Sequence, residues 1–367
     1  MTVRATRSEK IFISDCEGPI SKNDNAFELA GNLIPEGNHL FTLISRYDDV
    51  LADIVKREGY KAGDTLKLIL PFLKAYDVKN QMMVDFSSRS ILLMPGAKEM
   101  LEFVRAAMPA YIVSTSYEQY MRALCDIVGW PISNVYCTHL NLDKYTIIEE
   151  ERAELKRLAE EMVELPMLEI SKAARSLRDF PRRMQQTVQR LDEIFWKEIS
   201  SMKIGRILRE VNPVGGFEKA TAIKDIVTRL KRQVETVMYV GDSITDVSAF
   251  QLVRDAGGLT IAFNSNSYAV REAEVAVLSD NAIVTAVLAD LFSMLGKSRL
   301  LTLIRKWTPC TIEKSGISEP LKSRFLRVCR KKFPRVELIT GRNMKKLVLE
   351  STESRKSVRG EAIGKLG

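Results

Sequence analysis

Histidine and cysteine are scarce in this chain of 367 residues, which contains two of the former and five of the latter. The cysteines are scattered and form no C-x-x-C pair, so neither a zinc site nor a disulfide framework is indicated. With only His39 and His139 present, a Ser-His-Asp triad or a histidine-rich metal site is not expected either. Reduced thiols and a different kind of catalytic chemistry are the expectation.

Long apolar runs are also missing. The most apolar late segment, residues 282–304, is interrupted by Asp290, Lys297 and Arg299, which makes it a poor membrane span. No N-terminal segment combines a basic start, an apolar stretch and a small-residue cleavage site, so secretion is not expected. These absences predict a cytoplasmic protein.

Positive charge is concentrated at one end of the chain. The net charge is +8, but residues 296–367 hold 19 of the 55 Lys and Arg and only 6 of the 47 Asp and Glu. This segment includes RFLRVCRKKFPR, in which Phe325 and Phe333 lie among basic side chains. Such a segment could contact RNA or an anionic membrane surface, or it could be a basic helix that packs on the core. Packing is the simpler interpretation, because no RNA-binding signature accompanies it.

Short apolar segments alternate with helical ones in three stretches, residues 1–19, 96–140 and 211–295. The segments with strand character are residues 10–14, AYIVSTS, residues 135–137, VETVMYV, GLTIAF and VAVLSD. Short strands that alternate with helices predict an α/β fold with a Rossmann-like, doubly wound parallel sheet. We assign these three stretches to one core domain.

Two blocks with helical spacing interrupt this alternation. Residues 20–95 repeat apolar side chains every three to four positions, and residues 141–210 form a long charged stretch that Pro166 and Pro181 are expected to divide. We predict that each block is a helical insertion into the core. The second insertion could be a lid, a dimerisation arm or a surface for a protein partner. Residues 296–367 form a basic C-terminal extension.

Two acidic signatures follow predicted strands at widely separated places. IFISDCEGP contains Asp15 and Glu17, and TVMYVGDSITD contains Asp242 and Asp246. Carboxylates just beyond the carboxyl ends of buried strands lie at the edge of the sheet where open α/β folds bind their ligands. Clustered carboxylates repel one another unless a cation or a proton intervenes, and Mg²⁺ prefers oxygen ligands of this kind. The pattern therefore predicts metal-assisted chemistry on a phosphate group.

Four motifs occur in order at predicted strand ends or helix starts. They are D-x-E-G-P at residues 15–19, Ser114 in AYIVSTS, Lys219 at the start of a helix, and G-D-S-x-x-D at residues 241–246. This series resembles the haloacid dehalogenase superfamily of aspartyl phosphatases and phosphotransferases. The resemblance covers residues 10–19, 96–139 and 211–295. It implies that residues 20–95 are a helical cap, because in that superfamily a cap inserted after the first motif closes over the site.

The resemblance assigns catalytic roles to specific residues. It implies that Asp15 attacks phosphorus to form an aspartyl-phosphate, and that Glu17 protonates the leaving oxygen and later deprotonates the acceptor. Lys219 would neutralise negative charge on Asp15 and the phosphoryl group, and Lys224 is the reserve candidate for that role. Ser114 would donate a hydrogen bond to a phosphoryl oxygen.

Phosphate and metal binding follow from the same resemblance. Amides of Thr115 and Ser116 would supplement Ser114 and Lys219 in holding the phosphoryl group. The Mg²⁺ ligands would be Asp15, the backbone carbonyl of Glu17, and Asp242, with Asp246 ligating the metal or orienting its ligands. Each of these residues has a simpler alternative, since Asp and Ser after strands often form turns or cap helices.

Glu17 departs from the commoner D-x-D motif, because Glu is longer than Asp by one methylene. A glutamate here is similar to a minority branch near the phosphoserine phosphatases, so the residue could retain its acid–base role or favour phosphoryl transfer over hydrolysis. The whole pattern also resembles an archaeal branch of the superfamily in which some members are named accessory subunits of an energy-converting membrane hydrogenase.

We therefore expect a Mg²⁺-dependent phosphatase or phosphotransferase that acts on a small phosphorylated metabolite. The alternative is a non-catalytic or accessory subunit of a larger complex, for which the insertion and the basic extension would be docking surfaces.

Overall fold

One seven-stranded sheet organises the computed structural model, which describes residues 9–170 and 174–366. The strands are ordered β3-β2-β1-β4-β5-β6-β7, and all neighbours are parallel except the antiparallel pair β6 and β7. Their bounds are β1 Ile11–Ser14, β2 Ala110–Tyr117, β3 Val135–Thr138, β4 Val237–Gly241, β5 Leu259–Phe263, β6 Val275–Leu278 and β7 Arg335–Leu338.

Helices cover both faces of this sheet, as the doubly wound prediction requires. Strand side chains alternate between the two faces, so Phe12 belongs to one hydrophobic cluster while Ile11 and Ile13 belong to the other. The first face is covered by α6 Ala97–Ala107, α7 Glu118–Val128 and α14 Ile283–Ile304; the second by α11 Phe217–Arg229, α12 Val247–Asp255 and α13 Ser267–Glu272. The predicted fold class is confirmed.

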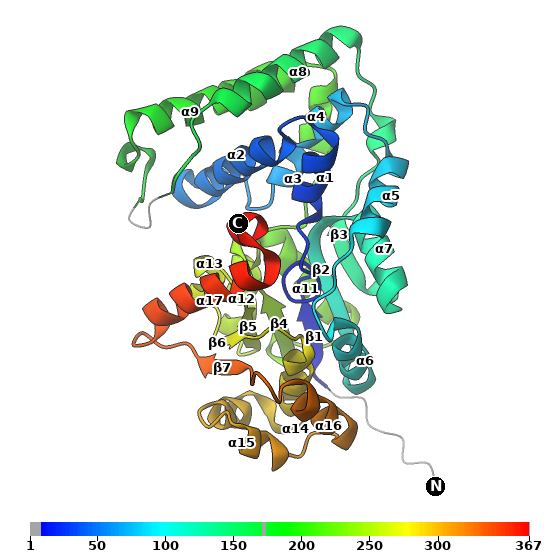
Figure 1. Cartoon of the computed structure of the whole chain (residues 1–367), viewed down its shortest axis with the longest axis vertical. Coiled ribbons are helices and arrows are strands. Elements are labelled where there is room, and N and C mark those ends of the chain that lie inside the picture. The colour runs from blue at the N-terminus through cyan, green and yellow to red at the C-terminus, as the bar shows by residue number, and fades with distance from the viewer. Residues whose placement is uncertain (1–8, 171–173, 367) are drawn as a thin grey trace.

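The two helical blocks share one hydrophobic cluster instead of forming separate units. Phe195 of the insertion stacks on Tyr47 and meets Phe72 edge-on, and both partners belong to the cap. Figure 1 shows the long helices of the insertion lying over the cap at the top of the molecule. The cap contains α1 Asn25–Leu33, α2 Gly37–Asp49, the π-helix Val50–Val55, α3 Thr65–Leu68, α4 Leu70–Ala75 and α5 Asn80–Ser90. The insertion contains α8 Glu149–Glu164, α9 Arg182–Glu193, the π-helix Ile194–Ile199 and α10 Ile207–Glu210.

Proline positions mark the division of the insertion. Helix α8 ends at Glu164, before Pro166, and Pro181 immediately precedes α9. Ion pairs lie on the exposed side of α8, such as those of Arg157 with Glu154 and Glu161. Binding of a protein partner by this surface stays a prediction.

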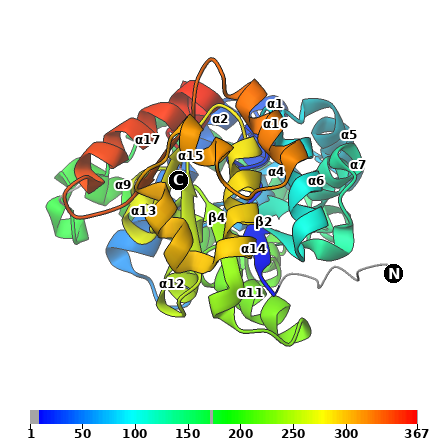
Figure 2. The same cartoon turned by 90° about the horizontal axis from the view of Figure 1, so that it is seen from below.

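The basic C-terminal extension is built into the core. It contributes β7, an element that the sequence did not reveal, and the helices α15 Pro309–Glu313, α16 Glu319–Val328, α17 Met344–Arg359 and α18 Glu361–Gly364. Figures 1 and 2 show α15 and α16 at the end of the molecule away from the cap, whereas α17 returns along the core towards it. Phe325 and Phe333 pack against Trp307 and each other. Contact with RNA or a membrane surface stays a prediction, but these rings already have partners within the fold.

Membrane insertion finds no support in the helices of the described residues. None of these helices is both long enough and apolar enough to cross a membrane.

Replacement of Phe195 by alanine tests whether the cap and the insertion form one cooperative unit. The fully buried ring contacts cap residues, so its loss should lower the free energy of unfolding by about 3–5 kcal/mol. Leu349→Ala, at a side chain that is 60% exposed, is the control and should change it by less than about 0.5 kcal/mol. Urea unfolding measures both. A loss confined to a separate insertion transition, with the cap unaffected, would contradict the shared core.

Candidate active site

The two acidic signatures meet because β1 and β4 are adjacent parallel strands. Ser14 is in register with Val240, so Asp15 and Asp242 leave the same edge of the sheet side by side. Asp246 follows in a short 3-10 turn after β4. One carboxylate oxygen from each of Asp15, Asp242 and Asp246 lies within 4.8 Å of the others, and all three residues are buried.

Asp15 is held at both of its carboxylate oxygens. The backbone N–H of Cys16 donates to Oδ1 at 2.7 Å, and Nζ of Lys219 lies 2.7 Å from Oδ2. Lys219 is completely buried in the first turn of α11. Burial raises the pKa of Asp15 to about 7, although Lys219 opposes the shift. The reserve candidate, Lys224, lies on the exposed side of the same helix, which makes Lys219 the cation of this site.

Asp246 uses all its acceptor capacity on protein donors. Its Oδ1 accepts from Lys219 Nζ at 2.7 Å and from the Tyr239 hydroxyl at 2.6 Å, and its Oδ2 accepts from the amides of Asp242 and Ser243. Burial raises the pKa of this carboxyl, but Lys219 and the hydrogen bonds outweigh burial and hold it below its usual value. A carboxylate has about four lone-pair sites. Asp246 therefore orients Lys219 and the loop, and is less suited to ligate a metal than Asp15 or Asp242.

Asp242 makes contacts that the sequence did not predict. Arg355 and Arg359 of α17 both donate to its Oδ2, the second at 3.0 Å, and Arg355 also donates to its backbone carbonyl at 3.2 Å. Gly18 approaches the same carboxylate closely: its φ is +108°, and a Cβ there would lie 2.1 Å from Asp242 Oδ2. Glycine in the D-x-E-G-P motif is thus needed both for its backbone conformation and for this close approach.

Glu17 and the hydroxyl residues of β2 occupy different positions around Asp15. Glu17 accepts a hydrogen bond from the amide of Asn25 at the start of the cap, and burial raises its pKa well above the usual value. The Ser114 hydroxyl is buried and donates to Ser116 Oγ at 3.1 Å, while the Ser116 amide donates to Ser114 Oγ at 3.2 Å. Thr115, not Ser114, lines the cavity above Asp15, and its hydroxyl donates to the carbonyl of Val214.

A small cavity of about 90 Å³ lies over the carboxylates, between core, cap and C-terminal segment. Asp15, Glu17 and Asp242 form its core side, and the cap contributes Asp48 and Asp49. Residues of the C-terminal segment complete the wall, namely Arg355, Arg359 and Leu366. Acidic side chains outnumber the cationic ones at this cavity, and burial raises the pKa of both Asp48 and Asp49 to about 7.

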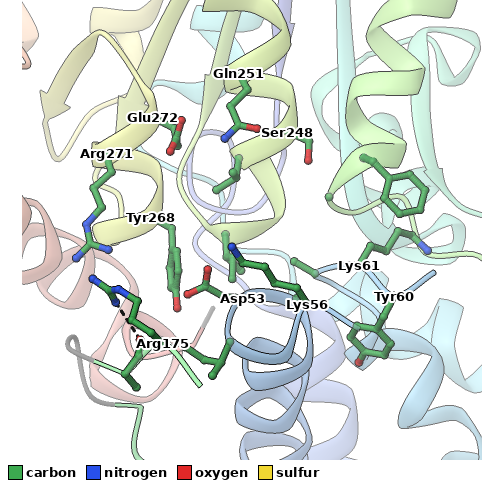
Figure 3. A pocket seen from close by; sticks show the side chains of 18 residues that line it. Asp53, Lys56, Tyr60, Lys61, Arg175, Ser248, Gln251, Tyr268, Arg271 and Glu272 are labelled. Carbon is green, nitrogen blue, oxygen red and sulfur yellow. Dashed lines mark hydrogen bonds between the residues drawn. The ribbon is translucent and has the colours of Figure 1, made fainter. Parts of the chain in front are cut away.

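A larger cavity of about 550 Å³ adjoins this site, and Ile244 lines both. Figure 3 shows Lys56 and Asp53 of the cap facing Tyr268 and Arg271 of the core. Asp49 and Asp53 are one helical turn apart, one at each cavity, and both raise the pKa of Tyr268 beyond the effect of its burial. The two spaces are therefore neighbours along one interface of cap and core.

A family model for haloacid dehalogenase-like hydrolases matches residues 103–289, which is about half of the chain. The chain belongs to this family. The assignment agrees with the parallel sheet and with the buried Asp15–Lys219–Asp246 arrangement at its carboxyl edge.

One solved structure resembles this chain over nearly its whole length. The structure of a gene product from Archaeoglobus fulgidus is 28% identical, with a TM-score of 0.79, and the match covers 98% of this chain and 99% of that one. The likeness therefore extends over the cap, the insertion and the C-terminal extension. A phospho-aspartyl intermediate analogue of phosphoserine phosphatase is 14% identical over 73% of this chain and 93% of that one, with a TM-score of 0.44. No curated protein sequence matches the chain.

The donor set fits a hard divalent cation. Asp15 and Asp242 are adjacent oxygen ligands, and the excess of carboxylates over cationic side chains calls for additional positive charge. Asp15, Asp242 and the backbone carbonyl of Glu17 would hold Mg²⁺, with Asp246 behind them. While α17 keeps its position, the two guanidinium groups on Asp242 oppose binding of a cation to this carboxylate.

Replacement of Lys219 by methionine tests the central ion pair through stability. The variant leaves Asp15 and Asp246 buried without their shared cation, so the free energy of unfolding at pH 7 should fall by about 3–5 kcal/mol. Lys224→Met on the exposed side of α11 is the matched control and should change it by less than about 0.5 kcal/mol. Equal losses in the two variants, measured by urea unfolding, would show that Lys219 has no special role.

Proposed function

We propose that this hydrolase is a Mg²⁺-dependent phosphatase or phosphotransferase that acts on a small phosphomonoester through an aspartyl-phosphate on Asp15. The observation that carries the proposal is the placement of the Asp15 carboxylate. It lies at the carboxyl end of β1, lines the cavity, and is fixed by Lys219 and the Cys16 amide beside a second carboxylate, Asp242. In its ionised form, which Lys219 favours, this carboxylate needs no base to act as a nucleophile.

The first step forms the bond between an Asp15 oxygen and phosphorus and breaks the bond between phosphorus and the ester oxygen. Glu17, which lines the same cavity, gives its proton to that leaving oxygen. In the second step Glu17 takes a proton from water or from an acceptor hydroxyl, whose oxygen attacks phosphorus and releases Asp15. Hydrolysis and transfer thus differ only in the attacking hydroxyl.

Fixed positive charge supports both steps. Lys219, held between Asp15 and Asp246, faces the charge that develops on the phosphoryl oxygens, and a bound Mg²⁺ would neutralise further charge there. The backbone amide of Thr115 is the candidate hydrogen-bond donor to the phosphoryl group, because the Thr115 hydroxyl and the Ser116 amide already donate to Val214 and Ser114.

The larger cavity is our candidate for the remainder of the substrate. The space over Asp15 is sufficient only for a group about the size of a phosphate, whereas the neighbouring space of about 550 Å³ could contain a metabolite. Its cationic side chains, Lys56 and Arg271, favour a substrate with a second anionic group.

Replacement of Asp15 by asparagine should abolish turnover, because the amide oxygen is a poor nucleophile. Phosphate release from a panel of small phosphomonoesters, with Mg²⁺ and with EDTA, measures this. Wild type should release phosphate only with Mg²⁺, and Asp15→Asn should fall at least about 10³-fold. Asp255→Asn, at an exposed residue at the end of α12, is the control and should retain activity. Unchanged release by Asp15→Asn would overturn the mechanism. No release from any ester would favour a transferase that lacks its acceptor, or an accessory subunit.

Arg271→Gln tests the assignment of the larger cavity. If Arg271 binds the distal anionic group of the substrate, KM should rise by about three- to tenfold with kcat nearly unchanged. Arg299→Gln, at an exposed position of α14, is the charge-matched control. An unchanged KM in Arg271→Gln would remove this residue from the substrate site.

A further inference from the structure

The C-terminal helix α17 has a fixed position on the core. Leu347 and Val348 pack against Val270 and Ala276. The hydroxyl of Ser351 accepts from the amide of Ser265 at 2.7 Å, and Ser354 donates to the side chain of Asn264 at the same distance. These contacts hold the first three turns of α17 against α13, β6 and the loop that follows β5.

This position directs two arginines into the active site. Arg355 and Arg359 are four residues apart, so they project from one face of the helix. Only 3% and 9% of their surfaces are exposed. Both guanidinium groups bind the same oxygen of Asp242, which is the carboxylate predicted to hold the metal beside Asp15.

Simultaneous binding of two guanidinium groups and a divalent cation to Asp242 is unfavourable. A cation ligated by this carboxylate would lie within a few ångströms of two positive charges, in a buried place where repulsion is weakly screened. The arginines already supply the charge and the hydrogen bonds that the carboxylate needs. Metal binding and arginine binding at Asp242 are therefore antagonistic.

The same segment fastens the cap to the core. Arg359 donates to the backbone carbonyls of Lys22 and Asn23, which precede the first cap helix. On the other side, Arg46 of α2 donates to the carbonyl of Lys365, and Leu366 joins the hydrophobic cluster of the cap. Withdrawal of the segment would thus free both Asp242 and the hinge of the cap.

The docked arginine is not fully satisfied. Among the described residues, no acceptor lies within hydrogen-bond distance of Arg355 Nε, although the atom is buried. An unsatisfied buried donor and a desolvated charge both reduce the net stability of the docked state. A cation that binds Asp242 more strongly can therefore displace the arginines.

We propose that residues 344–366 are a built-in occupant of the active site, in which Arg355 and Arg359 take the place of the divalent cation on Asp242. In this docked state the site is closed and inactive. Binding of Mg²⁺ to Asp15 and Asp242 displaces the arginines, releases the C-terminal segment from the cap, and opens the cavity. This inference rests on the proposed metal site.

The experiment uses the full-length protein and Mg²⁺ alone, without substrate. Isothermal titration calorimetry measures Mg²⁺ affinity in wild type, Arg355→Gln, Arg359→Gln and Lys356→Gln. The two arginine variants should bind Mg²⁺ about tenfold more tightly, since each removes a competing cation from Asp242. Lys356→Gln removes the same charge from the same helix but does not touch Asp242, because Lys356 pairs with Glu353. Its affinity should match that of wild type.

Hydrogen exchange on the wild-type protein gives a second readout that does not depend on the variants folding. Saturating Mg²⁺ should increase amide exchange in residues 344–366 and in the segment around Lys22 and Asn23, while the sheet remains protected. Asp242→Asn, which removes the shared ligand, should abolish this response to Mg²⁺.

The outcomes separate this inference from the proposed function. Metal binding with equal affinity in wild type and both arginine variants, or no change in exchange of α17, would overturn the displacement and leave the phosphatase proposal intact. Weaker Mg²⁺ binding in the arginine variants would also overturn it, because the arginines would then support the metal. No Mg²⁺ binding in any of these proteins would overturn both proposals.

Discussion

The structure depends on one constraint, the neutralisation of buried carboxylates at the carboxyl ends of β1 and β4. Asp15, Asp242 and Asp246 lie within 4.8 Å of one another in a place with little solvent. Charges so buried are stable only when they are paired and hydrogen-bonded. Lys219 forms ion pairs with Asp15 and Asp246, and two arginines form ion pairs with Asp242. The positions of α11 and α17 follow from this requirement.

This constraint connects parts of the chain that are far apart in sequence. The carboxylates come from the first and fourth strands, the lysine from α11, and the arginines from the last long helix. The basic extension adds β7 to the edge of the sheet. Helix α17 then runs along the core to the site, and the chain ends against the cap. The cap and the insertion share one hydrophobic cluster, so they form a single packed unit over the site. The candidate site is therefore in contact with segments from both ends of the chain.

The motif residues could be predicted from the sequence because each is part of a local pattern. Asp15 and Asp242 directly follow apolar strands, and parallel strands of an α/β sheet share an edge. The role of Asp246 was harder to predict from the sequence, since only the hydrogen bonds from Tyr239 and two amides show that its oxygens are already used. The Ser114 hydroxyl was expected to face the phosphate, but it is turned to Ser116, and Thr115 lines the cavity instead. A rotamer and a register irregularity of β2 decide such details, and neither leaves a periodic signal.

The sequence by itself determined the alternation of strands and helices, the acidic edge of the sheet and the identity of its lysine. These properties depend on neighbouring residues, through side-chain periodicity and the chemistry of short motifs. Only the tertiary structure decided that Arg355 and Arg359 belong to the active site, and that cap and insertion share a core. In the sequence the two arginines lie in a basic segment where many positions carry the same charge. Long-range packing of α17 on the core selects these two and directs them onto Asp242, because a buried carboxylate needs cations wherever the chain can bring them.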